Sequence, residues 1–179
     1  MALRKASAYS KKRVQPYTRT SRNKTRAYIK TVPFSKIVKL TAGDQGAFEA
    51  GKFPFEISYV TEESVQIRDN ALEACRMYLT KMLDMHALGQ YFMAVKVFPH
   101  HLVRENKSAG GMAGADRIST GMTQSYGQVI GRAAIVVPKS PIFIVSCTDE
   151  KTARIARDAL NTIKPKIPAR TRIVFTKVE

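Results

Sequence analysis

The feature that most restricts the fold of this 179-residue chain is the uneven distribution of its charge. The first acidic residue is Asp44, and the residues before it include twelve Lys and Arg side chains. Positive charges at this density repel one another in water, whereas phosphates neutralise them and release counterions, a main source of nucleic-acid affinity. Residues 1–32 are therefore predicted to form an irregular basic extension that binds a polyanion.

Three tyrosines, Tyr9, Tyr17 and Tyr28, are interspersed among these basic residues. Aromatic rings can stack on exposed bases while the cations pair with phosphates, a combination suited to structured RNA. A disordered solubilising tail remains the alternative. The residues predicted to contact RNA are Arg4, Lys5, Lys11, Lys12, Arg13, Arg19, Arg22, Lys24, Arg26 and Lys30.

Targeting and membrane segments explain the basic residues less well. A transit peptide needs an amphipathic helix, and residues 1–30 contain little apolar material. A polybasic membrane anchor needs a lipidation signal or an apolar face, and no stretch approaches the roughly 18 apolar residues of a spanning helix. The two cysteines, Cys75 and Cys147, lie in apolar stretches typical of reduced, buried thiols. We expect a cytoplasmic protein without membrane contact.

Residues 33–179 are expected to form a single domain, because a chain of this length buries most of its surface without disulfides. Alternating apolar residues and bounding glycines or prolines predict strands. The region after Pro99 is expected to continue the preceding strand, and residues 138–141 to join two strands as a hairpin. The expected strands cover residues 37–40, 55–60, 65–67, 91–98, 100–104, 132–137, 142–147 and 170–178.

Two helices are predicted from apolar residues that recur every three or four positions. The first has Asp69 as its N-cap and ends near Gly89, with Arg76 and Lys81 on a solvent- or RNA-facing edge. Thr148 is expected to cap the second helix and Pro165 to end it. The expected buried stripes are Leu72, Cys75, Leu79, Met82, Leu83 and His86 in the first helix, and Ala153, Ala156, Leu160 and Ile163 in the second.

The order strands, helix, strands, helix, strand predicts an α+β domain in which two helices cover one face of a largely antiparallel sheet. A long loop, residues 106–128, interrupts it and contains five of the ten glycines. Loops beyond about 15 residues are uncommon in compact domains and are usually functional or disordered. The sequence Gly-Gly-Met-Ala-Gly at residues 110–114 matches neither phosphate-binding glycine motif. We therefore expect this loop to reach a distant partner.

No catalytic or metal-binding group is expected. His100 and His101 are adjacent, so in a strand their side chains point to opposite faces and cannot chelate one metal together. Cys75 falls on a predicted buried stripe, which favours inert packing over nucleophilic chemistry. The prediction is a protein without enzymatic activity, metal or cofactor.

Three motifs show a resemblance to a known family. LEACR occupies residues 72–76, PHHLVRENK residues 99–107 and AGADRISTGM residues 113–122. Together with the basic extension, they resemble the large-subunit ribosomal protein family called L-ten-e in archaea and eukaryotes and L-sixteen in bacteria. The chain is most similar in form to archaeal members. At residues 127–129, Gly-Gln-Val stands where many eukaryotic members carry Gly-Lys-Pro, so a basic RNA contact is not expected at Gln128.

The resemblance implies an α+β protein of the large ribosomal subunit that binds 23S-type ribosomal RNA near 5S ribosomal RNA and neighbouring ribosomal proteins. It also implies a place beside the A-site tRNA channel, with the long loop approaching the P-site side of the peptidyl transferase region. The loop residues that match the family are Lys107, Ala113, Gly114, Ala115, Asp116, Arg117, Thr120, Gly121 and Met122.

The implied functions are rRNA binding, tRNA accommodation and subunit maturation in translation. A free-standing RNA-binding or RNA-processing accessory protein and a small RNA-acting enzyme remain the alternatives.

Overall fold

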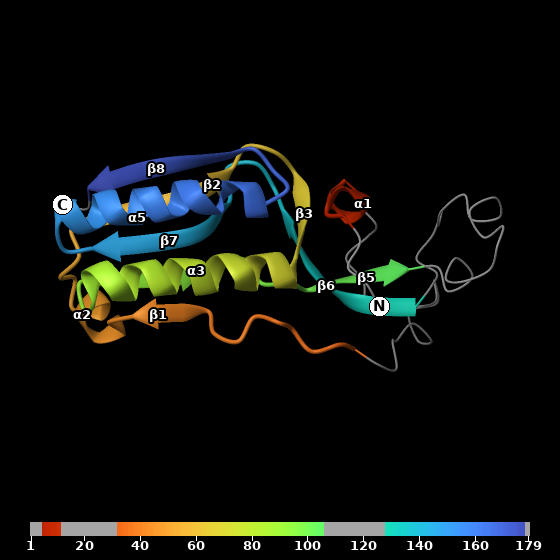
Figure 1. The fold of residues 1–179 in the computed structure, drawn as a ribbon, viewed down its shortest axis with the longest axis horizontal. Helices are drawn as coiled ribbons and strands as arrows, with labels where there is room; N and C mark the ends of the chain where they lie inside the picture. The colour runs from red at the N-terminus through yellow and green to blue at the C-terminus, as the bar shows by residue number, and fades with distance from the viewer. Residues whose placement is uncertain (1–4, 12–31, 106–127, 178–179) are drawn as a thin grey trace.

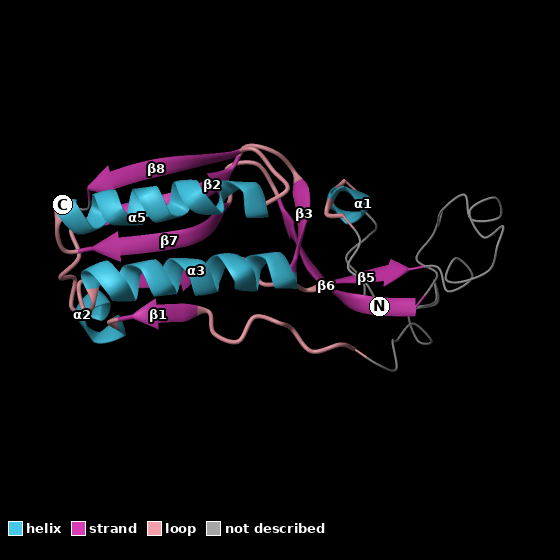
Figure 2. Ribbon diagram, in the orientation of Figure 1, coloured by secondary structure: helices cyan, strands magenta, loops and turns pink. Residues whose placement is uncertain are grey.

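The strands of the chain form two antiparallel sheets (Figures 1 and 2). The structure, a computed structural model, describes residues 5–11, 32–105 and 128–177. The larger sheet, sheet A, has the order β1-β4-β7-β2-β8. Its strands are β1 (Thr41–Gly43), β2 (Phe55–Thr61), β4 (Tyr91–Val95), β7 (Pro141–Cys147) and β8 (Thr171–Lys177).

A smaller sheet, sheet B, continues the centre of sheet A along the long axis of the molecule (Figure 1). It has the order β3-β6-β5, formed by β3 (Val65–Arg68), β5 (His101–Glu105) and β6 (Gln128–Val136). Three connections, β2 to β3, β4 to β5 and β6 to β7, cross between the sheets and preserve the strand order. The prediction of antiparallel pairing is confirmed, whereas the single sheet is replaced by two.

Thr61 joins two of these crossings. Its backbone N–H donates to the Ser140 carbonyl at 3.2 Å, its carbonyl accepts from Lys139 at 2.8 Å, and its hydroxyl donates to the Val137 carbonyl at 3.0 Å. The segment after β6 is thus bonded to the end of β2. The predicted hairpin is wrong: the strands before and after residues 138–141 belong to different sheets, because β2 supplies the hydrogen bonds that a hairpin partner would have made.

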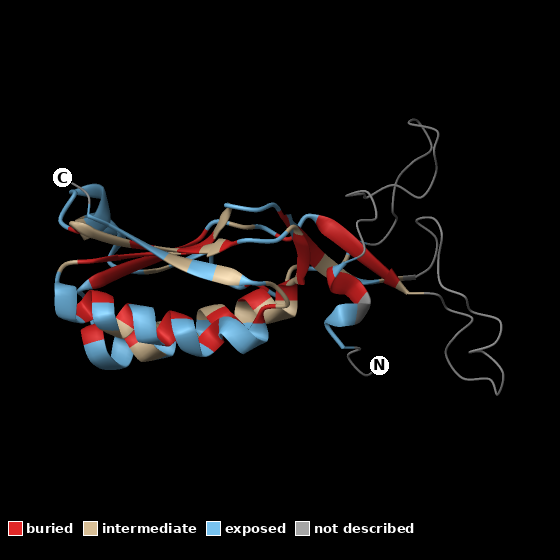
Figure 3. Cartoon of the chain, turned by 90° about the horizontal axis from the view of Figure 1, so that it is seen from above, coloured by how far each residue is buried: buried red, intermediate tan, exposed pale blue. Residues whose placement is uncertain are grey.

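Two long helices cover one face of sheet A, as predicted (Figure 3). They are α3 (Asp69–Ala87) and α5 (Glu150–Ile163), and α5 is followed by the short η2 turn (Lys164–Lys166) that contains Pro165. Leu72, Cys75, Leu79 and Leu83 of α3 are fully buried, as are Ala156, Leu160 and Ile163 of α5. They join one core with the inner residues of β2, β4 and β7. Fully burying a Leu or Ile side chain stabilises the fold by about 1.5–3 kcal/mol.

Two short helices were not predicted. α1 (Ser7–Ser10) lies within the expected irregular extension, and α2 (Gln45–Glu49) follows β1. The carboxylate of Asp44 accepts from the backbone N–H of Ala47 at 2.9 Å, which caps α2. Phe48 of α2 stacks on Phe92, with ring centroids 4.3 Å apart. α2 therefore covers the face of β4 that is turned away from the main core.

The first strand and both helix starts differ from prediction. Residues 37–40 are not a strand; β1 begins at Thr41. Asp69 is the first residue of α3 rather than its cap, and its carboxylate accepts from the N–H of Lys36 at 3.1 Å. Thr148 does not cap α5, since Asp149 occupies the N-cap position. The N–H of Thr148 instead donates to the Gln90 carbonyl at 3.2 Å, which ties the start of α5 to β4.

Two polar side chains on α3 also differ from prediction. His86 was placed on the buried stripe but is exposed, and Ala87 is buried in its turn of the helix. The periodicity predicts a solvent- or RNA-facing edge for Arg76, but its side chain is only 12% exposed in an ion pair with Glu73. Lys81 is exposed, as expected. β4 ends at Val95 and β5 starts at His101, so the strand predicted across Pro99 is two strands in different sheets.

Candidate nucleic-acid interface

The segments predicted to bind RNA adjoin sheet B. The long loop leaves β5 after Glu105 and returns at Gln128, and these two residues are paired in the register of β5 and β6. The extension is attached through α1, which packs against β3, and through Pro33, whose carbonyl accepts from Arg132 Nε of β6 at 2.6 Å. Sheet B therefore brings together the points where the extension and the long loop join the domain, although these two segments lie far apart in the sequence.

The contact between α1 and sheet B is both apolar and electrostatic. Tyr9 is 7% exposed and packs with Val103 of β5 and Ala133 of β6. The guanidinium of Arg68 lies 5.4 Å from the centre of the Tyr9 ring, within the range of a cation–π interaction. Part of the extension thus belongs to the folded domain, and Tyr9 is a packing residue rather than a free stacking platform.

Sheet B also buries two residues that could carry positive charge. His101 is 3% exposed and Arg104 is 7% exposed. Burial lowers the pKa of both side chains, and the nearby Arg104 charge lowers the pKa of His101 further. The His101 imidazole is therefore neutral at physiological pH, and its Nδ1 has no hydrogen-bond partner among the described residues. His100, which precedes β5, is exposed.

Two of the predicted RNA-binding residues lie in the described part of the chain. Lys5 and Lys11 flank α1 and are both exposed. The other eight residues of that set, from Arg4 to Lys30, lie outside the described residues. So do all nine loop residues, from Lys107 to Met122. These assignments stay predictions.

The sequence analysis missed a set of basic side chains along α5 and β8. Arg154, Arg157 and Lys164 of the helix segment and Arg172 of β8 line one groove. Their helical spacing of three and seven residues, displaced from the apolar stripe, was a usable signal. Arg68 and Arg132 were also missed, because their partners, Tyr9 and Pro33, are distant in sequence.

Neither a metal-binding cluster nor a reactive cysteine is found in residues 5–11, 32–105 and 128–177. Within those ranges, no group of three His, Cys, Asp or Glu residues is placed to hold a metal. Burial raises the pKa of both Cys75 and Cys147 to about 12, so each thiol is protonated and inert. None of the helices in the described residues is long and apolar enough to cross a membrane.

Sequence comparisons define the class of protein. Residues 12–174 match the family described as ribosomal protein L16p/L10e. The large ribosomal subunit protein uL16 of Methanosphaerula palustris is 41% identical over 154 residues, covering 86% of each chain. The protein of the same name from Methanococcus aeolicus is 38% identical, covering 99% of this chain and 96% of the relative. That of Archaeoglobus fulgidus is 40% identical, covering 91% and 87%. The chain belongs to the ribosomal protein L16p/L10e family, and these relatives are archaeal.

Proposed function

We propose that the chain is a structural constituent of the large ribosomal subunit in the cytoplasm and that it binds large-subunit ribosomal RNA. The observation that carries this proposal is the family match over residues 12–174, together with archaeal relatives named as large-subunit proteins. The net charge of +16 supports an RNA partner, because cations that neutralise phosphates release counterions. The proposal assigns the chain no catalytic step and no cofactor.

The geometry of sheet B supports a more specific role. Because the extension and the long loop leave the domain at the same sheet, one set of contacts can hold the domain on RNA while the other reaches away from it. We assign anchoring on 23S-type RNA, close to 5S RNA and neighbouring ribosomal proteins, to the extension. The loop, with two basic residues and one acid between Lys107 and Met122, is assigned to the A-site and P-site tRNA region and to subunit maturation.

Sedimentation tests the main assignment. A tagged copy of the chain should migrate with large subunits in a sucrose gradient and stay with them through a high-salt wash. A free-standing RNA-binding accessory protein, the alternative, would be stripped by the same wash. Loss of the chain from washed subunits would contradict a structural role.

Shortening the loop tests its separate role. Replacing residues 110–121 by a brief Gly-Ser turn should leave affinity for isolated ribosomal RNA nearly unchanged, because phosphate affinity scales with the number of neutralised phosphates. Peptide synthesis or late subunit maturation in a reconstituted system should be impaired. Arg117→Ala tests whether a single side chain carries this function of the loop. Arg117 is chosen because its planar guanidinium can pair with a phosphate or stack on a base. Full translation activity of both variants would contradict the loop assignment and leave RNA binding intact.

A further inference from the structure

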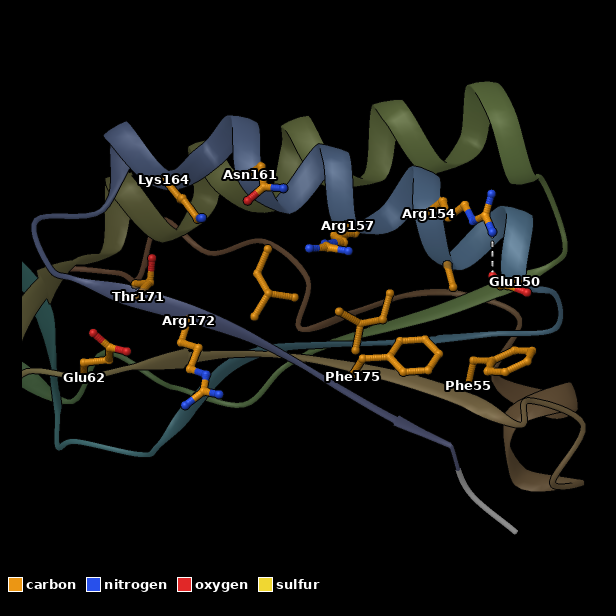
Figure 4. A pocket seen from close by; sticks show the side chains of 13 residues that line it. Phe55, Glu62, Glu150, Arg154, Arg157, Asn161, Lys164, Thr171, Arg172 and Phe175 are labelled. Atoms are coloured by element: carbon orange, nitrogen blue, oxygen red, sulfur yellow. Dashed lines mark hydrogen bonds and ion pairs between the residues drawn. The ribbon is translucent and has the colours of Figure 1, made fainter.

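A groove of about 870 Å³ lies between α5 and the β8 side of sheet A (Figure 4). Phe55 of β2 and Phe175 of β8 form its apolar end, with ring centroids 5.7 Å apart. Arg157, Asn161 and Lys164 lie along the helix side, toward the other end (Figure 4). The groove runs along sheet A between α5 and β8, and none of the residues that line it belongs to sheet B (Figures 1 and 4).

The helix wall of the groove follows from the periodicity of α5. Glu150, Arg154, Arg157, Asn161 and Lys164 are separated by three or four residues, so they share one helix face. This face lies beside the stripe of Ala153, Ala156, Leu160 and Ile163, which is buried against the sheet. The polar face therefore overhangs the edge of the sheet instead of packing on it.

The strand side of the groove is an open sheet edge. Among the described residues, β8 pairs only with β2, and its other edge has no strand partner. Val174 is 38% exposed and Phe175 is 53% exposed, so β8 presents apolar side chains as well as unpaired backbone groups. An unpaired edge is a template for a further strand.

The groove is lined by four basic side chains, Arg154, Arg157, Lys164 and Arg172, and by two acidic ones, Glu62 and Glu150, so positive charge is in excess. Arg154 pairs with Glu150 at 2.7 Å, but both side chains are exposed, and a surface pair of this kind exchanges easily. In the described part of the chain, no carboxylate lies within ion-pair distance of Arg157, Lys164 or Arg172. Arg157 and Lys164 lie on the helix side of the groove, whereas Arg172 points away from the helix (Figure 4). A ligand under the helix therefore gains from negative charge near Arg157 and Lys164.

We propose that the free edge of β8 binds an extended, acidic segment of a partner polypeptide as an additional strand of sheet A. Its backbone would pair with β8, its acidic side chains on the helix-facing side would lie under Arg157 and Lys164, and an apolar side chain on the same side would contact Phe175. The dimensions agree: a helix advances about 1.5 Å per residue, so Arg157 to Lys164 spans about 10 Å, and strand residues on one face repeat about every 6.7 Å. Two alternate positions of the segment can therefore meet these two cations.

A polypeptide strand explains the groove better than RNA or a second copy of the chain. RNA has no extended peptide backbone, so it would leave the free N–H and C=O groups of β8 without a strand partner. A second copy would bring Arg172 and Lys177 of one β8 against the same basic residues of the other. An acidic segment with apolar residues satisfies the backbone edge, the cations and the aromatic pair together.

Peptide binding to the full chain tests the proposal. The probe is a labelled, end-blocked peptide of about nine residues, with Glu at alternate positions in one half and Leu at alternate positions in the other. A second peptide with the reversed sequence is tested as well, because the added strand can run parallel or antiparallel to β8. Binding is measured by fluorescence anisotropy, and amide hydrogen exchange is followed for residues 171–177. We expect saturable binding that slows exchange of the outward β8 amides.

Three comparisons separate the sources of affinity. N-methylation of the peptide amides that face β8 keeps the charge but removes backbone donors, and it should weaken binding about tenfold. Arg157→Glu in the protein reverses one charge of the groove and should also weaken binding about tenfold. Lys151→Glu, the same charge change on α5 outside the groove, should leave binding within about twofold.

Absence of peptide binding would overturn the proposal. So would equal binding of the methylated peptide, or stronger groove-dependent binding of a single-stranded oligouridylate of similar length. The assay contains no ribosomal component, so its outcome is independent of the sedimentation result.

Discussion

The Glu73–Arg76 pair shows how one interaction changes the burial of a residue that periodicity places at a surface. Arg76 donates from Nε to Glu73 Oε2 at 2.8 Å and from Nη2 to Oε1 at 2.6 Å, a bidentate geometry. Glu73 also accepts from the N–H of Val38 at 3.4 Å. The segment before β1 thus covers the pair, and a charged side chain outside the apolar stripe becomes part of the interior.

The pair predicts a pH-dependent loss of stability. The Arg76 hydrogen bond is the main cause that lowers the pKa of Glu73, so the folded state favours the carboxylate. This stabilisation is present above the unfolded pKa, about 4.3, and is lost as pH falls through the lower folded value. Glu73→Gln should therefore lower the free energy of unfolding by about 1 kcal/mol at pH 7 and by much less near pH 3. Urea unfolding at both pH values measures this.

Glu150→Gln is the matched control for Glu73→Gln. Glu150 pairs with Arg154 at 2.7 Å, but the two side chains are 66% and 76% exposed. Exposed pairs contribute little, so this variant should differ from the native chain by only a few tenths of a kcal/mol at either pH. Equal effects of the two substitutions would show that burial does not strengthen the Glu73 pair.

At the scale of elements, the sequence predicted the helices better than the strand partners. The spacing of Leu72, Cys75, Leu79 and Leu83 fixes a buried helix face, because helix contacts depend on nearby residues. A strand pattern fixes which side chains share a face but not which strand lies alongside. β2 pairs with β7 and β8, and these partners lie more than 80 residues away in the sequence. The division into sheets A and B depends on these distant pairings.

Gly43 joins β1 to β4 and is predicted to be intolerant of any side chain. Its φ is +93°, and an added Cβ would lie 2.2 Å from the carbonyl oxygen of Tyr91. Gly43→Ala should lower the free energy of unfolding by more than about 2 kcal/mol, through both backbone strain and this collision. Chemical denaturation measures the loss.

Gly89→Ala isolates the backbone contribution to that loss. Gly89 has a φ of +73°, but no atom lies within 4 Å of its added Cβ. The variant should lose only about 1–2 kcal/mol. If Gly43→Ala were no more destabilising than Gly89→Ala, the collision of the added Cβ with β4 would not contribute to the loss of unfolding free energy.

At the scale of the molecule, the functional candidates are divided between the two sheets. Sheet B holds the points where the basic extension and the long loop join the domain, whereas the α5–β8 groove runs along sheet A (Figure 1). Composition predicted the basic extension from residues 1–43 alone. It could not predict that Tyr9 packs on sheet B or that α5 overhangs an open strand, since both depend on tertiary contacts.

The packing of Tyr9 decides how the extension must be tested. Deleting residues 1–32 would remove α1 and expose Val103 and Ala133, so lost affinity could reflect damage to sheet B. Neutralising the cations while keeping α1 avoids this. The substitutions to Gln are those at Arg4, Lys12, Arg13, Arg19, Arg22, Lys24, Arg26 and Lys30.

The neutralised protein should keep its free energy of unfolding but lose much of the salt dependence of its RNA affinity. The slope of log K against log salt should shrink by about 0.7–0.9 for each phosphate contact removed, between roughly 50 and 200 mM salt. Neutralising exposed lysines elsewhere, Lys52, Lys139 and Lys151, should change the slope far less per residue. A slope that does not change when all eight extension cations are removed would mean that the folded domain, and not the extension, supplies the RNA affinity.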